Sequence, residues 1–313
     1  MSTRTGIATS PRFLGHDTGP GHPECPERLE AVLDAIRGNP VGSRLIEVEP
    51  RAATVEELCL IHDAEYVGEI RDMCARGGGR LDFDTPLSAD SYEVALLSAG
   101  TVLTAVDAVL EGEVDNAFAL VRPPGHHARP TRGMGFCLFN NVAVAAQFAR
   151  RVPSIARVLI VDWDVHHGNG TQDAFYRDGN VFYFSTHQHP HYPGTGRHDE
   201  SGIGDGAGAT LNVPLTAGSG DDAYLSAFED RLVPAADAFR PDLVMISAGF
   251  DAHALDPLAG MLVTADGFGA LTDVVRSIAD RHCDGRLVSV LEGGYNLTGV
   301  AESAVRHLEH LAR

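Results

Sequence analysis

Short apolar runs alternate along the chain with longer segments in which apolar and polar positions repeat at helical spacing. Five of these runs are continuously aliphatic or aromatic, a pattern that is typical of parallel strands buried on both faces. Strands that alternate with helices form a mostly parallel sheet. We therefore predict an α/β fold whose clearest strands are Ala117–Val121, Arg157–Asp162, Val181–Ser185, Asp242–Ser247 and Leu287–Leu291.

The amphipathic segments between and around these runs supply the predicted helices. The chain contains no internal repeat, no low-complexity tract and no linker-like segment. Without a boundary of that kind, we expect a single domain over residues 1–313. The predicted helices are Pro26–Arg37, Val55–Leu60, Ser91–Glu111, Asn141–Arg151, Asp221–Phe239, Ala265–His282 and Val300–Ala312.

Polar clusters follow directly after all five predicted strands. In chain order they read RPPGHHARPTRGMGFCLFNN, VDWDVHHGNGTQ, STHQHPHYPGTG, SAGFDAHALDP and EGGYN. The functional site of an open parallel sheet lies outside the carboxyl ends of its strands, so these clusters should converge in space. One such cluster would be weak evidence of a site, whereas five in order predict one.

The composition is that of a soluble globular protein, with 44% hydrophobic and 21% charged residues. No apolar run approaches the roughly 20 residues that span a bilayer, and the first residues lack the apolar stretch of a secretory signal. The five cysteines are scattered and form no CxxC pair, which argues against a disulfide framework or a thiolate zinc site. We therefore expect a protein of a reducing compartment, the cytoplasm.

The net charge of −19 limits the partners that the protein can bind. Nucleic acids require clusters of Lys and Arg for their phosphates, so direct nucleic-acid binding is not expected. The same negative field attracts cationic substrates. Whether the chain forms a homo-oligomer is left open by the sequence.

The cluster DWDVHHG predicts a metal site. Asp164 and His166 are two positions apart, so on an extended segment their side chains point the same way. Asp251 in SAGFDAH supplies a third ligand. Two carboxylates and one imidazole with an open position suit a catalytic Zn²⁺, and they also accept Fe²⁺ or Mn²⁺. In the alternative interpretation, Asp164 caps the following turn and His166 is a hydrogen-bonded core histidine.

A metal with two anionic ligands acidifies its bound water only weakly, so the site needs a general base of its own. His126 and His127 in PPGHH are the candidates for this base. Asp162, which is not needed as a ligand, can orient one of the two imidazoles and raise its basicity. A solvated histidine pair in a loop is the alternative interpretation.

Tyr295 in EGGYN offers a phenolic donor beside Gly293 and Gly294, whose backbone can approach a substrate closely. A donor aimed at a developing oxyanion, together with a metal and a base, completes the groups needed for metal-assisted hydrolysis of an amide. The simpler interpretation of Tyr295 is an aromatic residue at the start of a helix.

Six motifs extend over nearly the whole chain, from about His16 to Asn296: HDTGPGHPECPERL, RPPGHHARPTRGMGFCLFNN, DWDVHHGNGTQDAFY, PGTG, SAGFDAH and EGGYN. They resemble the histone deacetylase superfamily, and most closely its class II branch with the bacterial deacetylase and acetylpolyamine amidohydrolase relatives. The resemblance implies an arginase-like α/β fold with a central eight-stranded, mostly parallel sheet flanked by helices. It also implies a zinc-dependent hydrolase that removes acetyl or other acyl groups from N-acetylated amines, above all acetyl-lysine side chains, and releases acetate.

The resemblance implies a role for each position of the reaction centre. The zinc ligands would be Asp164, His166 and Asp251, at the base of a narrow tunnel. Tyr295 would polarise the substrate carbonyl. Arg28 matches an arginine beside the internal cavity through which acetate leaves.

The tandem histidines have different roles in the resemblance. His126 matches the histidine that pairs with Asp162. His127 matches the general base and acid, and its partner position holds Asn169, as in the class II pattern. An amide in that position should tune the basicity of the imidazole less strongly than a carboxylate.

The tunnel and the structural cations are implied in the same way. Phe136 and Tyr192 match the aromatic pair of the tunnel wall, and Tyr192 stands where phenylalanine is more common. The remaining substrate-binding positions would be Gly135 and Gly294 along the tunnel, Leu258 at its mouth and Asp84 at its rim. A structural potassium would use Asp162, Asp164, His166, Ser185 and Thr186, and a second would use carbonyl groups of Phe175, Asp178 and Val181.

Three alternative functions remain beside this one. Polyamine-selective relatives carry an acidic residue at the position of Leu258, so an acetylpolyamine deacetylase is a neighbouring hypothesis. A dinuclear manganese ureohydrolase of the arginase type would share the fold, but His253 stands where an aspartate would bridge the two metals. A scaffold that merely binds acylated ligands would require the loss of a metal ligand or of Tyr295, and all are present.

Overall fold

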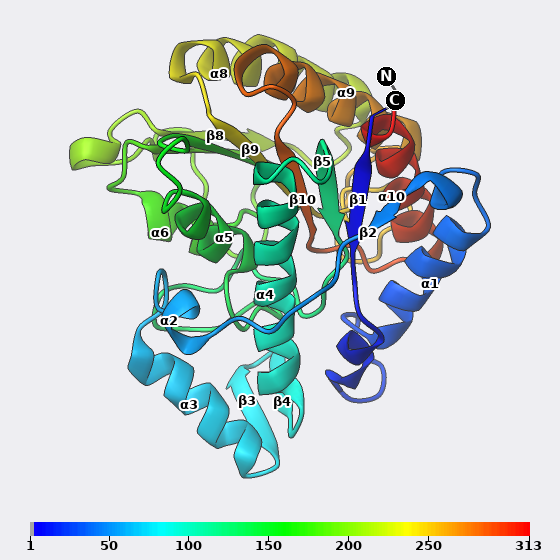
Figure 1. The fold of residues 1–313 in the computed structure, drawn as a ribbon, viewed down its shortest axis with the longest axis vertical. Coiled ribbons are helices and arrows are strands. Elements are labelled where there is room, and N and C mark those ends of the chain that lie inside the picture. The colour runs from blue at the N-terminus through cyan, green and yellow to red at the C-terminus, as the bar shows by residue number, and fades with distance from the viewer. Residues whose placement is uncertain (1–2) are drawn as a thin grey trace.

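One parallel sheet forms the centre of the molecule in a computed structural model that describes residues 3–313. Its eight strands lie in the order β2-β1-β5-β10-β9-β6-β7-β8, and every neighbouring pair is parallel (Figure 1). The expected eight-stranded sheet is therefore confirmed. The strands are β1 (Thr5–Ala8), β2 (Ile46–Glu47), β5 (Asn116–Ala119), β6 (Val158–Asp162), β7 (Val181–Gln188), β8 (Thr210–Leu215), β9 (Leu243–Ala248) and β10 (Leu287–Leu291).

The five strands predicted from apolar runs are the five adjacent central strands, β5-β10-β9-β6-β7. The apolar pattern missed β1, which is only four residues long, and the two edge strands β2 and β8, which are short or only partly buried. Strand β8 also contains Pro214, which is tolerated at a sheet edge because it lacks an N–H to donate. A separate antiparallel hairpin, β3 (Gly78–Asp82) with β4 (Thr85–Ser88), was not predicted either.

The helices cover both faces of this sheet, and most lie where the periodicity predicts them. The predicted helix Asp221–Phe239 is wrong as one element: Pro234 cannot continue the i→i−4 hydrogen bonds, and a π-helical turn, η4 (Phe228–Leu232), divides it. Helices α3 and α6 were not predicted. The α-helices are α1 (Pro26–Arg37), α2 (Val55–Leu58), α3 (Ala64–Ala75), α4 (Ser91–Leu110), α5 (Asn141–Ala149), α6 (Asn169–Phe175), α7 (Asp221–Ala227), α8 (Val233–Phe239), α9 (Ala265–His282) and α10 (Leu297–Leu311), and the 3₁₀ turns are η1 (Pro11–Gly15), η2 (Gly42–Arg44) and η3 (Gly204–Gly206).

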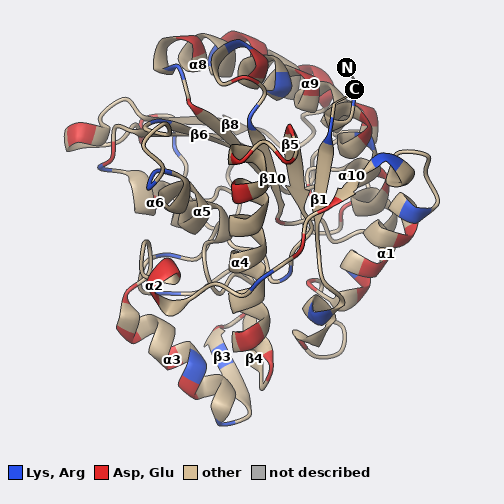
Figure 2. Cartoon of the chain, in the orientation of Figure 1, with Lys and Arg blue, Asp and Glu red and all other residues tan. Residues whose placement is uncertain are grey.

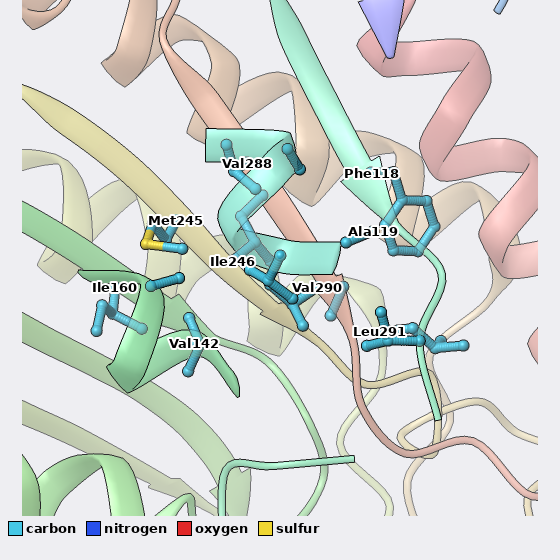
Figure 3. Packing of buried hydrophobic residues seen from close by; sticks show 14 of the residues in the cluster. Phe118, Ala119, Val142, Ile160, Met245, Ile246, Val288, Val290 and Leu291 are labelled. Carbon is cyan, nitrogen blue, oxygen red and sulfur yellow. The ribbon is translucent and has the colours of Figure 1, made fainter. Parts of the chain in front are cut away.

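The core lies on both faces of the central strands, because successive side chains of a strand point to opposite sides. On one face, Phe118 of β5 contacts His307 of α10 with ring centroids 5.0 Å apart. On the other face, Ile160 of β6 and Met245 of β9 lie near Val142 of α5 (Figure 3). Burial on both faces explains why these strands read as continuous apolar runs.

Helix α4 corrects one expectation about apolar length. It is 20 residues long and is the one helix among residues 3–313 that is long and apolar enough to cross a bilayer. However, 78% of its apolar stretch is buried inside the protein, where α4 packs against α5, β5 and β1. Gly100 lets the helix approach the backbone of residues 51–53, since a Cβ atom there would overlap it. The apolarity of α4 is accounted for by this packing.

Charged residues lie mainly on the helices and connecting segments, and the central strands carry few of them (Figure 2). The chain has 43 acidic and 24 basic residues, and every basic residue is an arginine. Four carboxylates, those of Asp162, Asp164, Asp251 and Glu292, are nevertheless fully buried at the carboxyl edge of the sheet. Glu24 is also fully buried, but it is paired with the buried guanidinium groups of Arg28 and Arg122.

Candidate active site

The sheet topology brings the predicted polar clusters together. The strands β5, β10, β9, β6 and β7 are neighbours and run in the same direction, so the segments that follow them lie along one edge. The register shows this directly, because Asp162 at the end of β6 lies beside Ser247 of β9 and Ser185 of β7. The expected convergence of the five clusters is confirmed.

Asp164, His166 and Asp251 form the centre of the site. One ligand atom from each lies within 4.8 Å of the other two, and all three residues are buried. Among residues 3–313 this is the only group of three or more His, Cys, Asp or Glu side chains with the spacing of a metal site. His166 places Nδ1 3.0 Å from Asp251 and 3.2 Å from Asp164, so the ring nitrogen faces both carboxylates.

Backbone amides hold the two carboxylates in place. The Asp251 carboxylate accepts the N–H of Val165 at 2.7 Å. The Asp164 carboxylate accepts the N–H of His166 and the N–H of Gly293, each at 2.9 Å. A Cβ atom at Gly293 would overlap the oxygens of both carboxylates. Glycine is therefore required at this position by the close approach of the backbone to the site.

The electrostatics of the cluster favour a bound cation. Burial opposes charge on the imidazole, but hydrogen bonds to Asp164 and Asp251 raise the pKa of His166 to about 10. Burial, together with the neighbouring Asp164, raises the pKa of Asp251 to about 7. Two desolvated carboxylates are strongly unfavourable without a compensating charge. The set of two oxygens and one nitrogen fits a divalent metal ion.

The tandem histidines lie beside this cluster with their ring centroids 4.0 Å apart. His126 donates from Nδ1 to Asp162 at 3.1 Å. His127 donates from Nδ1 to the Asn169 amide oxygen at 2.8 Å. Although burial opposes it, the charge of Asp164 and Asp162 raises the pKa of His126 well above its usual value. Burial lowers the pKa of His127 well below its usual value, so its Nε2 is free to accept a proton.

Tyr295 is fixed at the start of helix α10. The buried carboxylate of Asp256 accepts the N–H of Tyr295 at 2.6 Å, and Asn296 caps the helix by accepting the N–H of Gly299 at 2.9 Å. The guanidinium of Arg28 lies 4.8 Å from the centre of the Tyr295 ring. Burial raises the pKa of the phenol well above its usual value. The hydroxyl therefore stays protonated and can act as a hydrogen-bond donor.

Two aromatic rings border the approach to these groups. The Phe136 ring lies 5.5 Å from the Tyr295 ring, and the Tyr192 ring lies 5.2 Å from His127. Phe136 has a φ of 67°, in the left-handed region that is unfavourable for a residue with a Cβ atom, and it follows Gly135 with a φ of 56°. A strained backbone of this kind is typical of functional positions.

The predicted rim residues lie close to these rings. Leu258 is half-buried, and its carbonyl oxygen accepts a hydrogen bond from His191, the neighbour of Tyr192, at 2.9 Å. Asp84 lies in the turn of the β3–β4 hairpin. Its carboxylate accepts the hydroxyl hydrogen of Thr85 at 2.8 Å, and that hydroxyl accepts the N–H of Phe136 at 3.1 Å. The hairpin is thus joined to the aromatic wall.

The residues proposed for potassium form two groups. Ser185 and Thr186 are fully buried on β7, where Ser185 pairs with Asp162, and the Thr186 hydroxyl has no hydrogen-bond partner among the described residues. Phe175, Asp178 and Val181 lie between the end of α6 and the start of β7. The structure therefore brings the first group to the reaction centre and leaves the second at the α6–β7 connection.

The comparisons with known proteins agree with this geometry. A model of the histone deacetylase domain matches residues 22–311. The chain belongs to the histone deacetylase domain family. It is 45% identical over 333 residues to a histone deacetylase-like amidohydrolase of Pseudomonas aeruginosa, covering 100% of this chain and 87% of that protein. It is 42% identical over 297 residues to a probable deacetylase of Archaeoglobus fulgidus, covering 94% of this chain and 82% of that protein.

A solved structure supports the same assignment. The HDA15 HD domain superposes on this family member with a TM-score of 0.94 at 39% identity, covering 99% of this chain and 88% of that chain. Membership of the family makes the protein a hydrolase of amide bonds, a deacetylase or amidohydrolase of the histone deacetylase type. The dinuclear alternative has no structural support, because His253 faces away from the cluster and pairs with Glu302 at 2.9 Å.

Several residues of the site were missed by the sequence analysis. Tyr183 donates its hydroxyl hydrogen to Asp162 at 2.9 Å, and His191 stacks on His166 with ring centroids 5.1 Å apart. Tyr183 lies within an apolar strand and His191 lies in a loop, so neither position indicated a role in the site. Glu292 carried a clearer signal, because it is an acidic residue placed at the end of a buried strand.

Gly293→Ala tests the packing of the metal cluster. We expect the variant to fold and to bind a divalent metal about 10- to 100-fold more weakly, because the new methyl group displaces both carboxylates. The measurement is a competition titration with a chromophoric chelator. Gly68→Ala is the matched control, since a Cβ atom there has ordinary contact only, and it should bind metal as the wild type does. Equal affinities for all three proteins would contradict this account of the site.

Proposed function

We propose that this protein is a zinc-dependent deacetylase whose preferred substrates are acetyl-lysine side chains and whose products are the free amine and acetate. The observation that carries the proposal is the buried cluster of Asp164, His166 and Asp251 beside two histidines and a protonated tyrosine. That combination provides a cation site, a base and an oxyanion donor within one edge of the sheet.

Asp164, His166 and Asp251 would hold the zinc ion, which when bound supplies Lewis-acid polarisation of the substrate carbonyl and of water. His127 is the general base. It takes one proton from the attacking water as the oxygen bonds to the carbonyl carbon. It then returns that proton to the nitrogen as the C–N bond breaks, so that amine and acetate are released.

His126 and Tyr295 support this transfer in different ways. His126, paired with Asp162 at 3.1 Å, places positive charge next to the reacting water and orients the histidine pair. Tyr295 donates its hydroxyl hydrogen to the carbonyl oxygen as negative charge develops there. Phe136 and Tyr192 would enclose the aliphatic part of the lysine side chain. Gly135 would let the backbone approach that chain without a side chain of its own.

The remaining assignments follow the same reasoning. Asp84 would accept backbone N–H groups of the substrate at the rim, and Gly294 would leave room beside Tyr295. We also propose that potassium binds beside Ser185 and Thr186. The hydroxyl of Thr186, which has no hydrogen-bond partner among the described residues, supports an oxygen-liganded cation there. The carbonyls of Phe175, Asp178 and Val181 would hold a second potassium. All five cysteines are free, which supports a protein of a reducing compartment, the cytoplasm. The single eight-stranded sheet supports one domain.

The direct test is a side-by-side activity profile on acetyl-lysine peptides, acetylpolyamines and longer acyl-lysines. The chain contains no lysine, so acetate released in this assay comes from the added substrate alone. We expect acetate release from the peptides, with chelator sensitivity and recovery by Zn²⁺ or Fe²⁺. No release from any acylated amine would refute the proposal.

Tyr295→Phe should lower kcat about 10²- to 10³-fold, because it removes one oxyanion donor and little volume. Metal content and folding should be retained. A hydroxamate should still bind, since it can chelate the metal without this hydroxyl. Tyr176→Phe removes the same atom from a tyrosine outside the site and should be fully active. Turnover near the wild-type value in Tyr295→Phe would exclude the proposed role.

Leu258→Glu tests the choice of substrate. A carboxylate at the mouth would pair with the distant ammonium of an acetylpolyamine, and a partly buried pair of this kind is worth about 1–3 kcal/mol, or roughly 5- to 150-fold in preference. The ratio of kcat/KM for acetylspermidine to that for an acetyl-lysine peptide should rise by that factor. Leu262→Glu adds the same charge at a leucine that is 54% exposed and should leave the ratio unchanged.

The wild-type preference decides between the two substrate classes. If the wild type hydrolysed acetylpolyamines with a kcat/KM well above that for acetyl-lysine peptides, the protein would be an acetylpolyamine deacetylase. The argument from Leu258 would then be wrong, and the amide hydrolase assignment would stand.

A further inference from the structure

Glu292 is a buried carboxylate that the proposed reaction does not use. It directly follows strand β10, which lies between β5 and β9 in the sheet, and its side chain is fully buried. The ion pairs among residues 3–313 do not include it. Burial raises its pKa to about 7. A carboxylate in this setting must be compensated by hydrogen bonds.

Those hydrogen bonds come from the segment that carries the tandem histidines. Oxygen Oε2 of Glu292 accepts the N–H of Gly125 at 2.7 Å and the N–H of His126 at 3.1 Å. The second oxygen has one weaker partner, the Ser247 hydroxyl at 3.4 Å. One carboxylate oxygen therefore fixes two consecutive amides at the turn from which both imidazoles project.

The backbone of the same residue belongs to the segment that carries Tyr295. The carbonyl oxygen of Glu292 accepts a hydrogen bond from Arg28 at 2.6 Å, and Arg28 also donates to the carbonyl of Gly294 at 2.6 Å. The guanidinium of Arg28 then lies over the Tyr295 ring. Glu292 thus connects the segment after β10, which carries Tyr295, with the turn that carries His126 and His127.

We propose that Glu292 is a positioning residue that sets the placement of His126 and His127 relative to Tyr295 by accepting the two amide hydrogens of the histidine turn. The inference rests on the proposed function, because it assigns those three side chains to the reaction. Glu292 itself is not one of the three proposed metal ligands. Its contribution is geometric: an acceptor of the right length at the end of β10 holds a turn that follows β5.

Loss of this acceptor should act on turnover and leave substrate binding nearly unchanged. Displacement of a catalytic group by about 1 Å can cost about 10²-fold in rate. The aromatic wall of Phe136 and Tyr192 is held by other contacts, with Thr85 and with the loop of His191. We therefore expect Glu292→Ala to lower kcat about 10- to 100-fold and to change KM less than threefold.

Together with Glu292→Ala, two further variants separate the hydrogen-bonding role of Glu292 from the effect of its charge. Glu292→Gln keeps an oxygen for the two amides and places its NH₂ group towards Ser247, so it should restore kcat to within about threefold of the wild type. Ser247→Ala removes only the weak partner and should have wild-type kcat. Each protein is assayed for kcat and KM on one acetyl-lysine peptide, together with its metal content and its melting temperature.

Each outcome decides the proposal. Reduced kcat in Glu292→Ala with full metal content, unchanged KM and recovery in Glu292→Gln supports it. A Gln variant as slow as the Ala variant would show that the charge is needed and would overturn it. So would a loss of kcat that merely follows a loss of metal. If Glu292→Ala does not fold, a kcat more than tenfold below the wild-type value in folded, metal-loaded Glu292→Gln is enough to overturn the proposal. An inactive wild type would instead refute the proposed function.

Discussion

The fold depends on the cost of removing carboxylates from water at the carboxyl edge of its sheet. Asp162, Asp164, Asp251 and Glu292 are all fully buried there, and among residues 3–313 no arginine forms an ion pair with them. Unpaired, such groups would destabilise the fold by several kcal/mol each. Each one is instead supplied with donors: imidazole and phenol for Asp162, backbone amides for Glu292, and amides plus an imidazole for the Asp164–Asp251 pair. The remaining negative charge is what a metal ion bound by Asp164, His166 and Asp251 would compensate.

This constraint explains several features that otherwise look unrelated. The five central strands are apolar along most of both faces, and the one carboxylate that they contain, Asp162, lies at a strand end. Glycine at position 293 lets an amide reach Asp164 where a side chain would overlap both carboxylates. Asp256 and Asn296 fix the first turn of α10, and with it the Tyr295 hydroxyl. The groups proposed for catalysis are therefore held by strand ends and helix starts, which is how a site keeps its geometry without a substrate.

Much of this could be predicted from the sequence, because burial on both faces leaves a clear apolar pattern. The five central strands and the residues of the metal cluster were found in this way, and the family resemblance supplied the eight-strand sheet. Strand β1 was missed because its four residues are too few to show that pattern, and β8 because a partly exposed edge strand loses it. The split of the helix after Asp221 was missed because the amphipathic spacing continues through Pro234. Glu292, Tyr183 and His191 act through partners that are distant in the sequence. Such partners are visible only once the strand order is known.

The most direct test of this account is a count of metal ions in the purified protein and in Asp251→Ala, with activity and unfolding measured on the same samples. If a cation compensates the buried carboxylates, the wild type should contain about one tightly held divalent metal per chain. Removal of one of three ligands should then lower metal content and activity together, and a chelator should destabilise the wild type more than the variant. Full metal content and full activity in Asp251→Ala would contradict the account.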